Sequence, residues 1–160
     1  MCVDPFGGVA CQCGSRGCLE VYASATAIVR MVREARPRHP NSLLVSREEL
    51  TAEEIYWAGM KGDELALEAF RRMGVYLGIG LANLINILNP EMIVIGGGVA
   101  SAWELFAQHM QREIAERAFP VPAMEVKVVP GECGDDAGLL GAAHEAFSRN
   151  PQSILSEATA

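Results

Sequence analysis

The stretch Met92-Ile93-Val94-Ile95-Gly96-Gly97-Gly98 decides the fold class of this chain. Its four consecutive apolar residues predict a short strand that is buried on both faces, as strands are in α/β proteins. A helix is expected to follow over residues 101–117, so the three glycines join a strand to a helix. We therefore predict an α/β fold.

Periodicity and end signals predict the elements around this strand. Thr51 and Glu54 have the spacing of a capping box, and Asp63 is placed to cap a long helix. Gly74 and Gly78 lie one turn apart in that helix and should let another element pack closely. The remaining predicted elements are helices over 21–35, 51–59, 63–89 and 135–147, and a strand over 124–129.

Two strands make a poor sheet, so further strands are expected from a preceding segment or a partner. The predicted organisation is a loop over 1–20, a helical part over 21–89, an α/β part over 90–148 and a frayed polar tail over 149–160. No internal repeat or low-complexity tract is present.

Composition excludes several classes of protein. The chain has 160 residues, 50% of them hydrophobic and 21% charged, which argues against a disordered segment. The net charge of −7 comes without a basic cluster, so no nucleic-acid partner is expected. No apolar run approaches the roughly 18 residues of a membrane span, and residues 1–8 do not resemble a signal peptide, so we expect no membrane partner and a cytoplasmic location.

Three cysteines fall within eight positions, at Cys11, Cys13 and Cys18. In a reducing compartment such clustering indicates a metal rather than disulfides, although three ordinary thiols in a loop are the alternative. Structural zinc has four ligands, and the fourth is left open between Cys2, His39 and a residue upstream.

Other candidate residues have two interpretations. The glycines at 96–98 could admit a ligand to the backbone before a helix N-terminus, or they could only make a tight connection. Glu20 could bind substrate, or it could only favour a helix start. Asp135 and Asp136 could bind Mg²⁺, but we prefer a helix cap.

Residues 11–20, Cys-Gln-Cys-Gly-Ser-Arg-Gly-Cys-Leu-Glu, resemble the zinc signature of the ROK family of repressors and sugar kinases. The segments over 22–27, 89–98 and 134–143 are also similar to ROK glucokinases, so the resemblance covers about residues 1–148. It implies the C-terminal lobe of an actin/hexokinase-like (ribonuclease H-like) ATPase fold, with a zinc loop and a helical insertion.

The resemblance also implies a function: phosphoryl transfer from Mg-ATP to the 6-hydroxyl of a hexose, most commonly glucose, by a homo-oligomer. It implies a structural zinc on Cys11, Cys13 and Cys18, and a sugar hydroxyl bound by Glu20. The adenosine side of the ATP site would be lined by Gly97, Gly98 and Val99.

Several family elements have no counterpart in residues 1–160. They are a Glu-x-Gly-His element whose histidine is the fourth zinc ligand, an Asn-Asp pair that bears the catalytic base, and the phosphate-binding loops. We therefore expect the C-terminal part of a kinase that is inactive alone and contributes no catalytic base. The alternatives are part of a sugar-sensing ROK transcriptional regulator and a zinc-bound interaction module.

Overall fold

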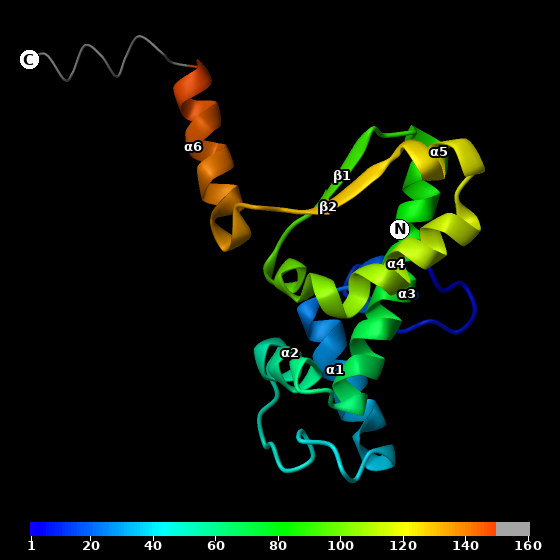
Figure 1. Ribbon diagram of the computed structural model, residues 1–160, viewed down its shortest axis with the longest axis vertical. Coiled ribbons are helices and arrows are strands. Elements are labelled where there is room, and N and C mark those ends of the chain that lie inside the picture. Colours follow the sequence, from blue (N-terminus) through cyan, green and yellow to red (C-terminus); the bar gives the residue numbers. More distant parts are fainter. Residues whose placement is uncertain (150–160) are drawn as a thin grey trace, which may run out of the picture.

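The computed structural model describes residues 1–149. The tail expected over 149–160 therefore lies outside the described residues, except for Arg149, which ends the last helix. Helices dominate the described part, and a short two-stranded sheet follows the longest of them (Figure 1). The elements are α1 (Ala25–Ala35), α2 (Ala52–Met60), α3 (Glu64–Leu88), β1 (Met92–Ile95), α4 (Trp103–Arg117), α5 (Pro120–Glu125), β2 (Lys127–Pro130) and α6 (Ala137–Arg149).

The predicted caps of α2 and α3 are confirmed. Thr51 Oγ1 accepts from the Glu54 amide at 3.1 Å, and Glu54 Oε2 accepts from the Thr51 amide at 3.2 Å, which completes a capping box. Asp63 Oδ1 accepts from the Ala66 amide at 3.1 Å at the start of α3. Asn89 ends α3 in the left-handed conformation, with φ of 43°.

The first helix begins later than predicted. Residues 19–21 form a single 3₁₀ turn, η1 (Leu19–Val21), and α1 starts only at Ala25. The reason is a cap at Ser24, whose hydroxyl accepts from the Ala27 amide at 3.2 Å while its own backbone is extended. Glu20 therefore lies in a separate turn before the helix.

The predicted close packing at Gly74 and Gly78 is confirmed, because α4 lies along this face of α3. A Cβ on Gly74 would lie 2.6 Å from the carbonyl oxygen of Phe106, and one on Gly78 would lie 2.5 Å from that of Met110. The two backbones approach so closely that only glycine fits. The core is centred on this contact and includes the fully buried Phe70, Met73, Phe106 and Met110.

The second strand is shorter than predicted. The expected strand over 124–129 divides into α5 and β2, which begins at Lys127. Pro120 is the first residue of α5, a position where its fixed φ suits a helix and no amide hydrogen is needed. The strands β1 and β2 pair in parallel, with Met92 opposite Lys127 and Ile95 opposite Pro130.

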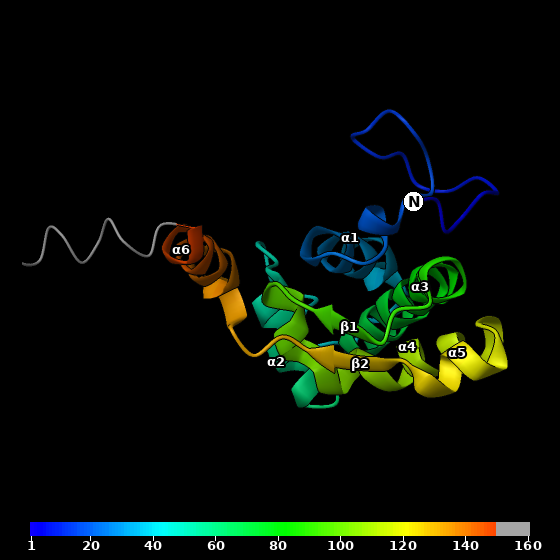
Figure 2. The same ribbon diagram turned by 90° about the horizontal axis from the view of Figure 1, so that it is seen from above.

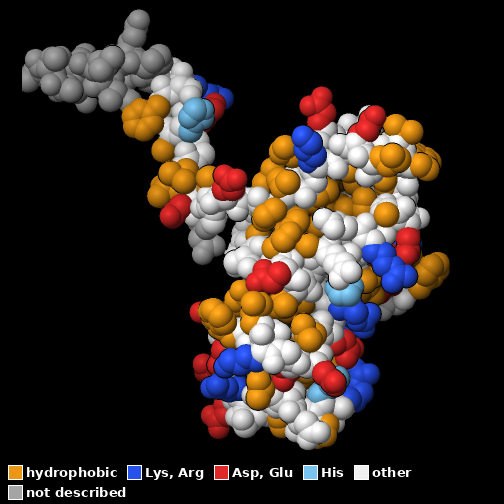
Figure 3. Space-filling view, viewed as in Figure 1, with side chains coloured by type: hydrophobic (Ala, Val, Ile, Leu, Met, Phe, Trp, Pro, Cys, Tyr) orange, Lys and Arg blue, Asp and Glu red, His pale blue; other side chains and the backbone are white. Residues whose placement is uncertain are grey.

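The expectation that β1 is buried on both faces is wrong for this chain. Met92 is 52% exposed and Val94 58% exposed, whereas Ile93 and Ile95 pack against the core. Within residues 1–149, only the face of the strand that carries Ile93 and Ile95 is covered. Hydrophobic side chains gather on the surface around the sheet in Figure 3.

The last helix stands apart from the rest of the described structure. Figures 1 and 2 both show α6 away from the body, joined by the chain that follows β2, and none of its residues is buried. A 3₁₀ turn over Gly134–Asp136 precedes it. The side chain of Asp135 lies outside what the structure describes, so its role as a cap stays a prediction. Among the described helices, none has the length and apolar character that a membrane crossing requires.

Candidate functional site

The three clustered cysteines converge in the loop over residues 1–20, which we call the metal loop after the role proposed for these cysteines below. The sulfur atoms of Cys11, Cys13 and Cys18 lie within 4.8 Å of one another, and those of Cys13 and Cys18 are 3.6 Å apart. Zinc–sulfur bonds of about 2.3 Å place tetrahedral thiolate ligands roughly 3.8 Å from one another. The cluster therefore has the donor atoms and the dimensions of three corners of a zinc site.

Glycines let the metal loop fold back on itself. Gly14 and Gly17 have φ values of 88° and 71°, which side chains other than glycine rarely adopt. The Cys11 amide donates to the Ser15 carbonyl at 2.9 Å, and the Gly14 amide donates to the Cys11 carbonyl at 3.0 Å. These turns bring the side chains of Cys11 and Cys13 next to that of Cys18.

The close sulfur atoms affect one another's protonation. The neighbouring thiols of Cys13 and Cys11 raise the pKa of Cys18 to about 11. The pKa of Cys13 is lowered, first by a hydrogen bond with the backbone of Ser15 and then by the thiols of Cys11 and Cys18. Three thiolates at this distance repel one another, and a bound divalent cation would relieve that repulsion.

The structure separates the candidates for a fourth ligand. His39 lies in the loop after α1, where its Nε2 pairs with Glu68 Oε2 at 3.2 Å, and it is not part of the cysteine cluster. Cys2 remains beside the cluster, because it forms an antiparallel bridge with Cys18. Its own thiol points to the Arg16 carbonyl oxygen at 3.7 Å. A Cys2 ligand would require its side chain to turn.

Glu20 lies directly beside the metal loop cysteines. Its carboxylate oxygen Oε2 accepts from the Cys11 thiol at 3.9 Å, and its side chain is exposed. Leu19, the residue before it, packs on α3 at Gly80, where a Cβ would lie 3.0 Å from the leucine side chain. Gly80 thus packs closely against this turn, and the carboxylate of Glu20 lies at the surface next to the thiols.

A cavity of about 920 Å³ lies at the carboxyl ends of β1 and β2. One wall is the backbone of Gly96, Gly97 and Gly98, and a second is the segment over 130–134 that follows β2. Gly97 has φ of 85°, and no atom lies within 4 Å of the place where its Cβ would be. The backbone here is open to a ligand.

Aromatic residues that the sequence analysis did not single out complete the cavity. Tyr56 and Trp57 come from α2, and Trp103 begins α4. An adjoining apolar cavity of about 230 Å³ lies behind the turn and is lined by Val99 and Tyr56. No signal along the chain links α2 to the glycine turn, since only tertiary packing places them together. Of the described residues that line the larger cavity, none belongs to the metal loop.

Comparison with known proteins identifies relatives of two kinds. The sequence profile of the ROK family matches residues 1–147. A glucokinase of Halalkalibacterium halodurans is 38% identical over 143 residues, which are 87% of this chain and 43% of that protein. The crystal structure of a ROK family glucokinase from Streptomyces griseus, in complex with glucose and AMPPNP, is 30% identical and has a TM-score of 0.74, over 90% of this chain and 48% of that one.

The second kind of relative is a regulator. The crystal structure of a ROK family transcriptional regulator, a homologue of the E. coli MLC protein, is 36% identical and has a TM-score of 0.74, over 81% of this chain and 33% of that one. The chain thus spans less than half the length of each of these relatives. The described fold is common to part of a sugar kinase and part of a regulator.

Proposed function

The chain belongs to the ROK family, and on this premise we propose that it is the C-terminal part of an ATP-dependent hexose kinase. The proposed reaction transfers the γ-phosphoryl group of ATP to the 6-hydroxyl of a hexose, with glucose as the first candidate. Residues 1–148 would form one lobe of an actin/hexokinase-like fold. The glucokinase relative whose structure contains glucose and AMPPNP supports both substrates.

The single observation that favours a kinase is the open glycine turn at the cavity of about 920 Å³. A nucleotide needs close approach to the backbone, and the unobstructed Gly97 provides it. Gly97 and Gly98 would contact the adenosine side of Mg-ATP, and Val99 would back the turn from the smaller cavity. A regulator that senses only sugar has no need of this cavity.

Glu20 would position the sugar in this proposal. Its exposed carboxylate can accept a hydrogen bond from a sugar hydroxyl, and its place in η1 next to Cys11 fixes the direction from which the sugar is bound. Zinc held by Cys11, Cys13 and Cys18 would supply a structural clamp for this loop, with no contact to the reacting atoms. The remaining carboxylate function, that of a general base, is assigned to no residue of this chain.

The second candidate is part of a sugar-responsive regulator, which the 36% identity to the ROK transcriptional regulator favours. The metal loop and Glu20 would serve sugar binding in either case. The two functions differ in the nucleotide, which only the kinase uses. The interaction module without a sugar or nucleotide site has no separate observation in its favour.

A coupled assay tests the proposal. The 160-residue chain, given ATP, Mg²⁺ and glucose, should show no enzyme-like turnover, because loss of a general base alone costs about 10²–10⁴-fold. Joined in frame to the N-terminal half of the H. halodurans glucokinase, it should phosphorylate glucose. Glu20→Gln should lower that activity, and Glu49→Gln, at an exposed carboxylate in the loop before α2, should not. Rapid turnover by the chain alone, or a joined enzyme indifferent to Glu20→Gln, would contradict the assignment.

A further inference from the structure

We infer that Tyr22 is a positioning residue whose hydroxyl holds the metal loop in the shape that its ligands require. The side chain lies just after η1 and is only 3% exposed. The inference deepens the proposed function, because the same loop carries Glu20, and it assigns Tyr22 no contact with metal or sugar.

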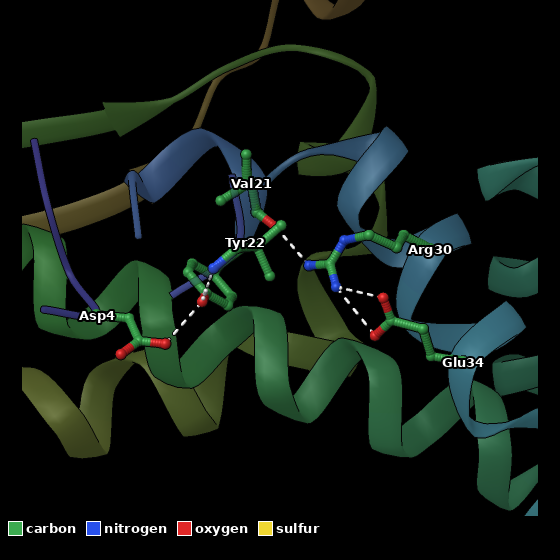
Figure 4. Close-up of polar contacts among 6 residues, drawn as sticks. Asp4, Val21, Tyr22, Arg30 and Glu34 are labelled. Carbon is green, nitrogen blue, oxygen red and sulfur yellow. Dashed lines mark hydrogen bonds and ion pairs between the residues drawn. The ribbon is translucent and has the colours of Figure 1, made fainter. Parts of the chain in front are cut away.

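The hydroxyl of Tyr22 joins two distant points of the metal loop. It donates a hydrogen bond to Asp4 Oδ2 at 2.7 Å and accepts one from the Val9 amide at 3.0 Å. Figure 4 shows the contact between Tyr22 and Asp4. Both hydrogen-bonding capacities of one partly buried hydroxyl are therefore used by the loop.

Asp4 and Val9 in turn hold the residue before the ligand Cys18. The Asp4 amide donates to the Gly17 carbonyl at 3.2 Å, and the Gly17 amide donates to the Val9 carbonyl at 2.8 Å. The carbonyl of Gly17 is thus hydrogen-bonded to Asp4 and its amide to Val9. These are the same two residues that form hydrogen bonds with the Tyr22 hydroxyl. If Asp4 or Val9 moved, Gly17 would move with it, and Cys18 is the next residue in the chain.

Close packing leaves this part of the loop little freedom. A Cβ on Gly17 would lie 1.9 Å from the Asp4 carbonyl oxygen, and one on Gly8 would lie 2.5 Å from the Gly17 Cα. Backbone segments in such contact move together rather than independently. The hydroxyl of Tyr22 consequently positions Asp4, Gly8 and Gly17 as one unit, and Cys18 moves with that unit.

The helices fix the tyrosine itself. Its ring stacks on Tyr76 of α3, with the ring centroids 4.0 Å apart and the planes 21° apart. Arg30 of α1 donates to the Val21 carbonyl at 2.7 Å and pairs with Glu34 at 2.9 Å, as Figure 4 shows. The Tyr22 ring and the turn before it are therefore held by the helices. The hydroxyl in turn fixes Asp4 and Val9 relative to those helices through its two hydrogen bonds.

Tyr22→Phe tests this role, because it keeps the ring and its stacking and removes only the hydroxyl. Residues that orient metal ligands typically change metal affinity by about 10–100-fold when replaced. We expect a weakening of zinc binding in this range, measured on the 160-residue chain by competition with a chromophoric chelator. In the metal-free protein, hydrogen exchange at the amides of Val9 and Gly17 should accelerate, while exchange in the core of α3 should not.

Tyr76→Phe is the matched control, because it removes a hydroxyl from the other ring of the same stack, and among the described residues that hydroxyl has no hydrogen-bond partner in the metal loop. It should leave zinc affinity and loop exchange unchanged. The inference would be overturned if the two variants changed zinc affinity and loop exchange equally. It would also be overturned if Tyr22→Phe changed neither zinc affinity nor the exchange of Val9 and Gly17. A parent chain that binds no zinc would refute the metal proposal instead, and the exchange rates of the metal-free protein would still decide the role of Tyr22.

Discussion

The carboxylate oxygen Oε2 of Glu20 lies 3.9 Å from the sulfur of Cys11. The proposed sugar-binding group and a proposed metal ligand are therefore direct neighbours, although nine positions separate them in the sequence. A metal bound to the thiols would restrict the carboxylate, whose backbone lies in η1. In the proposed function, this relationship would link metal content to sugar binding.

The first prediction concerns metal content. The chain purified without added zinc should contain about one zinc ion, as structural thiolate sites do. Cys13→Ser should lower both zinc content and glucose affinity, because it removes a proposed ligand from the cluster that lies beside Glu20. Metal analysis and glucose titration measure the two effects. Cys133→Ser, at an exposed cysteine outside the cluster, is the control and should change neither. A metal-free parent chain would contradict this prediction.

A second prediction concerns the contact between α3 and α4. Gly74→Ala should lower the free energy of unfolding by about 1–3 kcal/mol, the usual cost of overpacking. The added methyl group would lie 2.6 Å from the backbone oxygen of Phe106, which cannot move without separating the helices. Denaturant unfolding measures the change. Gly138→Ala, where no atom lies within 4 Å, should be neutral or stabilising, since alanine favours a helix. Similar losses in both variants would contradict the packing argument.

The third prediction concerns pH. Partial burial of His109, followed by the charges of Arg71 and Arg112, lowers its pKa below the ordinary value of 6.5. As the pH falls below 6.5, the unfolded chain takes up a proton at this residue before the folded chain does, so stability falls. His109→Gln should remove the part of this acid-induced loss of stability that comes from residue 109. Unfolding measured above and below pH 6.5 should give a flatter profile for the variant, with His144→Gln on exposed α6 as control. The prediction would be refuted if the stability of the parent chain, relative to that of His109→Gln, rose as the pH fell below 6.5.

A fourth prediction is self-association. Met92 is 52% exposed on β1 and Met124 is 86% exposed on α5. Hydrophobic side chains also gather on the surface around the sheet in Figure 3. Such surface favours contact with a second apolar surface. Sedimentation should therefore give species heavier than the 17.2 kDa chain. Met92→Lys with Met124→Lys should shift the distribution towards monomer, whereas Leu67→Lys on α3 should not. A parent chain that sediments as a monomer would contradict this.

The sequence predicts the elements whose signals are local. Thr51 and Asp63 mark helix starts through their caps, and the glycine pair in α3 predicts a close neighbour. The errors also have local causes. Ser24 caps the helix that was predicted to begin at residue 21, and Pro120 begins a helix, α5, that reaches into the segment predicted as a strand.

The candidate site was predictable where one short segment carries it. The cysteine spacing and its glycines predict a convergence that the structure contains. Tyr22 could not be found this way, because its hydroxyl acts on Asp4 and Val9 through folding of the loop. The same holds for Tyr56 and Trp57, which only the packing of α2 brings to the glycine turn.

Nucleotide binding tests the central claim most directly, because it distinguishes a kinase from a regulator. Both tryptophans of the chain, Trp57 and Trp103, line the cavity at Gly97, so their fluorescence should respond to a ligand bound there. Titration with Mg²⁺ and AMPPNP should change the emission saturably. Gly97→Val should abolish the change, because a φ of 85° strains a β-branched residue and the valine side chain would occupy the open space proposed for the ligand. An emission that does not respond to AMPPNP, or an equal response in Gly97→Val, would contradict the assignment of this chain to a kinase.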